Sequence, residues 1–234
     1  PVVWNGLQQS LQQAQAMPLP GYADSEAVQG LEAGAQSLEC RIPQGAVVVG
    51  WSLGALFALR LAMRMPSCIS ALVLIGATPC FVKRPDWPHG VEADVFAQFG
   101  QSLAEDYSAT IRRFLSLQAQ GASDMKASLG ELRRRLLDQA RPPAGVLDDG
   151  LDILREADLR SELPSLSMPV CLIHGQSDRL APVAAARWMR DNIANAELHE
   201  IPGAAHAPFL SHPDRVVSLI EAVLSRDGIS REEA

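Results

Sequence analysis

Apolar residues along the chain fall into two patterns, short continuous runs and longer stretches with helical spacing. A short run bounded by turn residues is typical of a strand buried on both faces of a sheet. We expect such strands at residues 46–49, 71–76, 169–175 and, with a weaker signal, 196–201. Because helical stretches separate these runs, the pattern predicts an α/β fold with a mostly parallel sheet flanked by helices.

The stretches between the runs predict amphipathic helices. Trp4, Leu7 and Leu11 fall at i, i+3 and i+7, which describes one apolar helix face. Further helices are expected over residues 26–38, 53–65, 183–192 and 214–224.

A long segment without any strand pattern separates the second run from the third. A crossover between parallel strands needs only about a dozen residues, so the pattern predicts an inserted helical cap over residues 81–163. Residues 1–80 and 164–234 would then form the core. Within the cap, helical faces are marked by Val95, Phe99 and Leu103, by Ile111, Phe114 and Leu115, and by Leu129, Leu132, Leu136 and Leu137.

Composition narrows the class of protein. A chain of 234 residues with 47% hydrophobic residues is large enough for one domain with an insertion. Its net charge of -7 argues against nucleic acid or an anionic membrane as a partner. No apolar run approaches the roughly 20 residues that span a bilayer, and no signal segment opens the chain.

The cysteines and the other residue types that bind metals do not show the spacing of a metal site. The 4 cysteines are scattered without metal-ligand spacing, which is typical of reduced thiols in a cytoplasmic protein. Neither a clustered ligand set nor a glycine-rich phosphate loop is present, so we expect no metal and no cofactor. We expect a cytoplasmic monomer.

One serine lies where the first run gives way to a helix. Gly50-Trp51-Ser52-Leu53-Gly54 is a G-x-S-x-G motif between a buried strand and a helix, the context of a nucleophile elbow. We expect Ser52 at the tip of a strained turn that needs small residues at both Gly50 and Gly54. The alternative is a serine that only caps the following helix.

A serine nucleophile needs a base, which is most often histidine. His206 follows the last run in Gly203-Ala204-Ala205-His206-Ala207-Pro208, among small residues that would let its ring approach Ser52. Active groups in parallel sheets lie on loops after the carboxyl ends of strands. The positions of the other histidines are better explained by structural roles: His89, His174, His199 and His212.

An acid is needed to orient the imidazole. Asp178 lies in the loop after the third run, whereas Asp191 lies on a helix and Asp148 and Asp149 lie in the insertion. The order Ser52, Asp178, His206 is that of the α/β-hydrolases. The backbone amide of Leu53 is expected to be one oxyanion donor, and the second is expected from a strand and loop that precede residue 1.

Several stretches resemble the pimeloyl-[acyl-carrier protein] methyl ester esterases of biotin synthesis. The resemblance lies in Gly50–Gly54, Ala77–Phe81, Trp87-Pro88, Arg113–Gln118 and Ala204–Phe209, and it covers nearly the whole chain. It implies an α/β-hydrolase fold whose N-terminal strands are absent from this sequence. It also implies Ser52 as nucleophile, His206 as base and Asp178 as orienting acid, with Trp51, Phe81 and Phe114 lining the acyl site.

Positive charge gathers in the predicted cap of this acidic chain. Because acyl carrier proteins are strongly acidic, such a face would suit the docking of one. The residues expected to dock the carrier are Arg112, Arg113, Lys126, Arg133 and Arg134.

Two other functions fit the same motifs. A general carboxylesterase or a hydrolase of carbon–carbon bonds would keep the triad and change the substrate, because fold and triad do not determine substrate. The third hypothesis is a non-catalytic binding module with the same fold.

Overall fold

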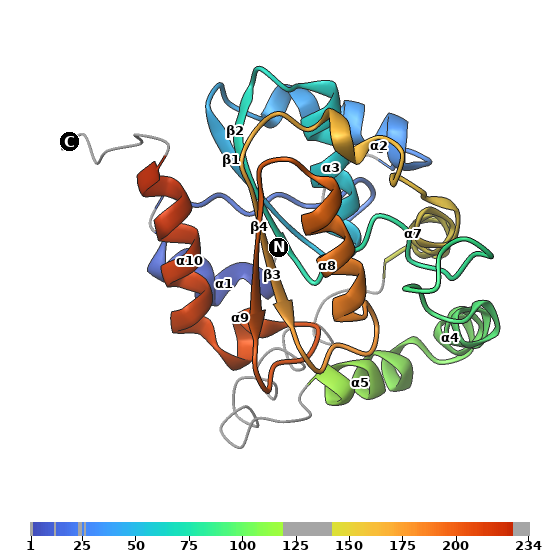
Figure 1. Ribbon diagram of the computed structural model, residues 1–234. Helices are drawn as coiled ribbons and strands as arrows, with labels where there is room; N and C mark the ends of the chain where they lie inside the picture. Colours follow the sequence, from blue (N-terminus) through green and yellow to red (C-terminus); the bar gives the residue numbers. More distant parts are fainter. Residues whose placement is uncertain (1, 12, 23–24, 26, 119–141, 227–234) are drawn as a thin grey trace.

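The computed structural model describes residues 2–11, 13–22, 25, 27–118 and 142–226, with only the backbone described for residues 2 and 114–118 (Figure 1). Its sheet contains β1 (Ala46–Trp51), β2 (Ile69–Ile75), β3 (Val170–Gly175) and β4 (Ala196–Ile201), in that spatial order and all parallel. The predicted parallel sheet is confirmed. Since β1 continues through Gly50 and Trp51, Ser52 directly follows the strand.

Helices cover both faces of the sheet (Figure 1). One face is covered by α2 (Leu31–Leu38), α3 (Leu53–Arg64) and α8 (Val183–Asn192), and the other by α1 (Asn5–Ser10), α9 (Pro208–Ser211) and α10 (Pro213–Arg226). Leu72 and Leu74 pack on the α3 side, whereas Val73 and Ile75 pack on the α10 side. This alternation explains the continuous apolar run, because both faces of the strand are buried.

The helix boundaries agree with the sequence pattern at most ends. The helix predicted over residues 26–38 begins instead at Leu31, because Gly30 has φ 80° and its N–H donates to Asp149 Oδ1 at 2.8 Å. The described chain also contains short 3-10 helices at Val2–Trp4, Glu39–Arg41 and Leu163–Ser165.

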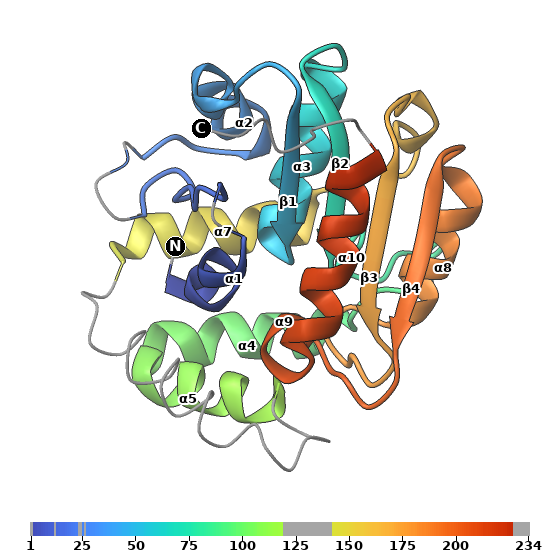
Figure 2. The same ribbon diagram turned by 90° about the vertical axis from the view of Figure 1, so that its left-hand side faces the viewer.

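Helices α4 (Ala93–Glu105), α5 (Tyr107–Gln118) and α7 (Ala144–Glu156) lie between β2 and β3 in the chain. Figure 2 shows α4 and α5 beyond the arrowheads of the strands, at the end of the sheet where Ser52 lies. The sequence pattern predicted α4 and α5 but not α7. The helix predicted around Leu129–Leu137 and the cap arginines beyond position 118 lie outside the described residues, and the division of the chain at 81 and 163 stays a prediction.

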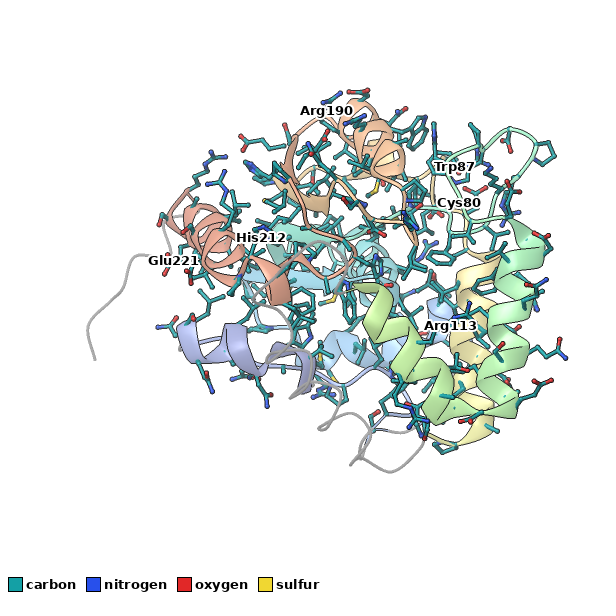
Figure 3. The ribbon with its side chains drawn as sticks, turned by 90° about the horizontal axis from the view of Figure 1, so that it is seen from below. Cys80, Trp87, Arg113, Arg190, His212 and Glu221 are labelled. Atoms are coloured by element: carbon teal, nitrogen blue, oxygen red, sulfur yellow. The ribbon has the colours of Figure 1, made fainter. Side chains whose placement is uncertain are left out.

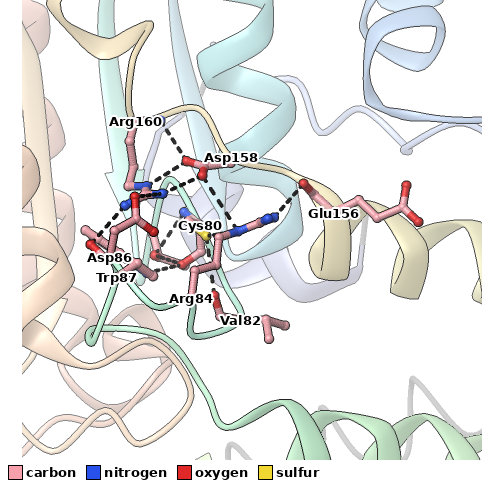
Figure 4. Close-up of polar contacts among 9 residues, drawn as sticks. Cys80, Val82, Arg84, Asp86, Trp87, Glu156, Asp158 and Arg160 are labelled. Carbon is pink, nitrogen blue, oxygen red and sulfur yellow. Dashed lines mark hydrogen bonds and ion pairs between the residues drawn. The ribbon is translucent and has the colours of Figure 1, made fainter.

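A cluster of polar contacts, which we name the clasp, ties the two ends of this helical segment together (Figure 4). Cys80 forms an isolated antiparallel bridge with Asp158 and accepts a hydrogen bond at its carbonyl from the Trp87 indole at 2.8 Å. Arg160 donates to both Asp158 oxygens at 2.8 and 2.7 Å and lies 5.3 Å from the Trp87 ring centroid. Arg84 Nε donates to the Cys80 sulfur at 3.2 Å. These contacts join the segment that follows β2 to the segment that follows α7.

Candidate active site

Ser52 occupies a strained turn between β1 and α3. Its φ of 54° and ψ of -121° make it the one non-glycine residue with positive φ in the described part of the chain. Such a conformation costs on the order of 1–3 kcal/mol and is found at functional sites. The predicted elbow is therefore present in the backbone.

The two motif glycines differ in what the turn demands of them. A Cβ at Gly50 would lie 2.7 Å from both Ala55 Cα and the Gly54 carbonyl oxygen, so α3 packs too closely for any side chain there. A Cβ at Gly54 would meet no described residue within 4 Å outside its own helix. The expectation that both glycines are needed has a steric basis at Gly50 and none at Gly54 among the residues that the structure describes.

The amide of Leu53 lies at the first position of α3. The first N–H groups of a helix have no acceptor within the helix and lie at the positive end of its dipole. The Leu53 amide can therefore donate to an oxyanion beside Ser52, in keeping with its predicted role.

The loop that carries His206 crosses the carboxyl ends of β2 and β3 at close range. A Cβ at Gly76 would lie 2.9 Å from the His206 carbonyl oxygen and 3.0 Å from its Nδ1. A Cβ at Gly175 would lie only 2.1 Å from the Ala205 carbonyl oxygen. Ser52 N–H donates to the Ile75 carbonyl at 3.1 Å, so the serine and the histidine both flank the Ile75–Gly76 strand end.

Asp178 is bound to the imidazole as predicted. His206 Nδ1 lies 2.7 Å from Asp178 Oδ2, with both side chains almost fully buried. The N–H groups of Leu180 and Ala181 each donate to Oδ1 at 2.9 Å. Burial alone would raise the pKa of this carboxyl, but the charge of His206 and the hydrogen bonds from His174 and His206 outweigh burial and hold the pKa below its usual range.

His174, which the sequence pattern assigned to the end of a strand, is also part of this network. Its Nε2 lies 2.6 Å from the Ala181 carbonyl oxygen and 3.3 Å from Asp178 Oδ2. Both neighbours are acceptors, so Nε2 carries a hydrogen. The four-residue spacing to Asp178 was the available signal, but contact across a loop does not follow from spacing alone.

The second nitrogen of His206 is available for chemistry. Its Nε2 is buried and has no hydrogen-bond partner among the residues that the structure describes. Because Nδ1 faces a carboxylate, Nδ1 carries the hydrogen in the neutral ring and Nε2 has a free lone pair. A buried, unpartnered nitrogen with this orientation can accept the proton of a hydroxyl.

A groove of about 2370 Å³ runs along β1 and reaches Ser52. Leu53, Tyr22 and Tyr107 are among the residues that line it near the serine. Burial, followed by the charges of Tyr107 and Asp149, raises the pKa of Tyr22 to about 12, so its hydroxyl stays protonated and neutral. Because the groove runs the whole length of β1, only its end at Ser52 and Leu53 lies beside the elbow.

The aromatic residues predicted to line the acyl site lie in different surroundings. Trp51 lines the groove and packs against His206, with ring centroids 5.6 Å apart. Phe81 is buried edge-on against Phe96 of α4, with centroids 5.6 Å apart. The side chain of Phe114 lies outside the described part of the chain.

Only part of the predicted docking face can be placed. Arg112 and Arg113 are exposed on α5, and Figure 3 shows Arg113 on that helix from below. Lys126, Arg133 and Arg134 lie outside the described residues.

The remaining histidines lie away from the Asp178 network. His89 packs edge-on against Trp87, and His212 Nδ1 contacts the Ser211 hydroxyl at 2.9 Å. His199 lies on β4, where burial is the main cause of its lowered pKa. The choice of His206 among the five histidines is thus consistent with the contacts to Asp178.

None of the described helices combines the length and hydropathy needed to cross a bilayer. No cluster of three or more histidine, cysteine or acidic side chains in the same residues could hold a metal ion.

Comparison with known proteins identifies relatives of this chain. The model of the alpha/beta hydrolase family matches residues 14–219. The pimeloyl-[acyl-carrier protein] methyl ester esterase of Nitrosomonas europaea is 41% identical over 226 residues, covering 94% of this chain and 90% of that protein. The protein of the same name from Aromatoleum aromaticum is 42% identical over 236 residues, covering 96% and 93%.

A solved structure shows the same fold at lower sequence identity. The esterase from Exiguobacterium antarcticum superposes with a TM-score of 0.85 at 20% identity, covering 95% of this chain and 87% of that one. Together with the strained serine turn and the buried Asp178–His206 pair, these matches show that the chain belongs to the alpha/beta hydrolase family, in the group of the pimeloyl-[acyl-carrier protein] methyl ester esterases.

Proposed function

We propose that this chain is a serine carboxylester hydrolase that forms an acyl-enzyme. The observation that carries the proposal is the buried His206–Asp178 pair. Its Nε2 has no hydrogen-bond partner among the described residues, and its loop approaches the Ile75–Gly76 strand end, which also binds the Ser52 N–H. A serine hydroxyl is a weak nucleophile unless a base takes its proton, and this geometry supplies the base.

The reaction has two halves. Ser52 Oγ attacks the ester carbonyl carbon while His206 Nε2 takes the hydroxyl proton, and the Leu53 amide donates to the oxyanion. The tetrahedral intermediate collapses, the C–O bond to the alcohol breaks, and His206 protonates the departing alkoxide. Water then attacks the acyl-enzyme while its proton passes to His206. The second tetrahedral intermediate collapses, the C–O bond to Ser52 Oγ breaks, His206 returns the proton to Oγ, and the acid is released as the second product. Asp178 stabilises the imidazolium in both halves.

The substrate proposed is the methyl ester of a pimeloyl chain on acyl carrier protein, with methanol as the alcohol released. Support comes from the two relatives of that name at 41% and 42% identity. The groove beside Ser52 would receive the aliphatic chain, with Trp51, Phe81 and Phe114 as proposed acyl contacts. The exposed Arg112 and Arg113 on α5 support an acidic carrier as partner, and Lys126, Arg133 and Arg134 are proposed for the same face. We propose a monomeric, cytoplasmic enzyme without a cofactor.

The test compares Ser52→Ala with wild type and with Ser70→Ala. Ser70 donates to the Gly45 carbonyl at the opposite end of the sheet, so its loss should leave turnover unchanged. Ser52→Ala should lower ester turnover by at least about 10³-fold, with the fold retained. A fluorophosphonate should label wild type and Ser70→Ala but not Ser52→Ala. Equal hydrolysis of p-nitrophenyl acetate by Ser52→Ala and wild type would refute the nucleophile.

The carrier is tested separately by ionic strength. Docking between a basic face and an acidic carrier is screened by salt, so kcat/KM for methyl-pimeloyl carrier protein should fall with added salt while kcat/KM for methyl pimelate should not. An equal response of both substrates would support a general carboxylesterase and refute the carrier.

A further inference from the structure

The residue that precedes Ser52 binds the loop of the base. The indole N–H of Trp51 donates to the His206 backbone carbonyl at 2.8 Å, across 155 positions of sequence. Trp51 is the last residue of β1 and is joined through its own peptide bond to Ser52. One side chain therefore connects the strand of the nucleophile directly to the residue that takes its proton.

Packing holds the indole in this orientation. Its ring lies edge-on to Phe209, with centroids 5.2 Å apart and planes at 80°. Phe209 packs in turn on Trp4 at 5.1 Å. The indole also packs against the His206 ring, with centroids 5.6 Å apart and planes at 48°. Since these rings leave the indole little rotational freedom, its N–H is aimed at a single acceptor.

The loop that carries His206 has few polar attachments at the histidine itself. Its residues 203–208 are glycine, alanine and proline apart from the histidine, so their side chains offer no polar anchor. The Ala204 N–H donates to the Ile201 carbonyl at 3.3 Å, and the Ala204 carbonyl accepts from Ser177 N–H at 2.9 Å. Among the described residues, the bond from Trp51 is the one that holds the backbone of His206 itself. Asp178 holds the imidazole at Nδ1, and Trp51 holds the main chain of the same residue. Two points of attachment are what define the direction of Nε2.

We propose that Trp51 is a positioning residue for His206, in addition to being a wall of the groove. The inference rests on the proposed serine esterase activity and adds to it the residue that sets the distance between nucleophile and base. Small displacements of a catalytic group lower rates steeply, by up to about 10²-fold for 1 Å. The two roles of Trp51 make different kinetic predictions. Loss of a wall raises KM for long acyl chains, whereas loss of positioning lowers every step that uses His206.

The experiment uses p-nitrophenyl acetate, whose acetyl group is too short to need an acyl wall. Rapid mixing separates acylation, seen as the burst, from deacylation, seen as the steady rate. Trp51→Phe keeps an aromatic ring against Phe209 and removes the N–H. We expect both rates to fall by about tenfold and by the same factor, with KM changed by less than about twofold. Trp188→Phe, whose ring contacts Trp87 instead, is the matched control and should keep both rates.

A second replacement and a spectrum make the test independent of folding. With 3-benzothienylalanine at position 51, sulfur replaces the indole N–H at nearly constant shape, and the same loss of both rates is expected. The low-field proton resonance of the His206–Asp178 bond should shift or broaden in both proteins. Unchanged rates in the benzothienyl protein would overturn the proposal, as would a rise in KM alone. If wild type gives no burst and no fluorophosphonate label, the esterase function itself is refuted.

Discussion

Gly175 is the position where a single methyl group should disable the site without touching any of its functional groups. It ends β3, and its hypothetical Cβ would lie 2.1 Å from the Ala205 carbonyl oxygen and 2.4 Å from the Ala204 carbonyl oxygen. Both neighbours are backbone atoms of the loop that carries His206. Gly175→Ala must therefore displace either that loop or the strand end.

The size of the displacement follows from these distances. Non-bonded atoms reach their optimum at about 3.5 Å, so full relief of the 2.1 Å contact would need a retreat of the loop by roughly 1.4 Å. Overpacking of this kind typically costs 1–3 kcal/mol of unfolding free energy. A 1 Å misplacement of the imidazole lowers the rate by up to about 10²-fold. We therefore expect kcat for p-nitrophenyl acetate to fall by about 30- to 100-fold while the protein remains folded.

The assay combines esterase kinetics with urea denaturation. Gly145→Ala is the matched control, because a Cβ at that position of α7 meets none of the described residues within 4 Å. The control should keep wild-type turnover and gain about 0.5 kcal/mol of stability from the reduced freedom of the unfolded chain. If Gly175→Ala keeps kcat within about threefold of wild type, the close approach of the loop to β3 does not determine the position of His206.

Two further changes test the acid and the clasp. Asp178→Asn should lower kcat by about 10³- to 10⁴-fold. Since the pKa of the Asp178 carboxyl is depressed in the fold, its ionised form stabilises the protein above the unfolded pKa of about 4, and this contribution is lost as pH falls from that value through the folded pKa. The difference in unfolding free energy between wild type and variant should therefore hold steady above about pH 5 and shrink below about pH 4. A difference that stays constant down to about pH 3 would contradict the assignment. Arg160→Ala removes two hydrogen bonds to Asp158 and should cost about 2 kcal/mol in urea denaturation, whereas Arg190→Ala, which removes an exposed pair with its neighbour Asp191, should cost less than about 0.5 kcal/mol.

The elements with strong local signals could be predicted from the sequence. Helix α8 has the predicted boundaries, and strand β4 has them as well despite its weaker apolar pattern. Helix α7 was not predicted because its buried face is short, with Val146, Gly150 and Ile153 set among aspartates. Periodicity detects an apolar face only where enough large side chains mark it.

The site was predictable in its chemistry but not in its supports. Chain order and loop position were enough to pair Asp178 with His206. The contact of His174 with Asp178 and the bond from Trp51 to His206 depend on how loops cross the sheet, which no local pattern encodes. The expected need for Gly54 came from the motif alone. The close packing of α3 gives a steric reason for Gly50 and none for Gly54 among the described residues.

The turn around Asp178 makes the acid independent of the residue it serves. Leu180 and Ala181 hold Oδ1, and His174 reaches Oδ2, so three donors other than His206 define the direction of the carboxylate. When the imidazole gains or releases a proton, the negative charge that answers it does not have to turn or recruit solvent. The reorganisation that accompanies each proton transfer is thereby confined to the imidazole and the hydroxyl groups. A preorganised polar site has this lower reorganisation free energy as its advantage over water.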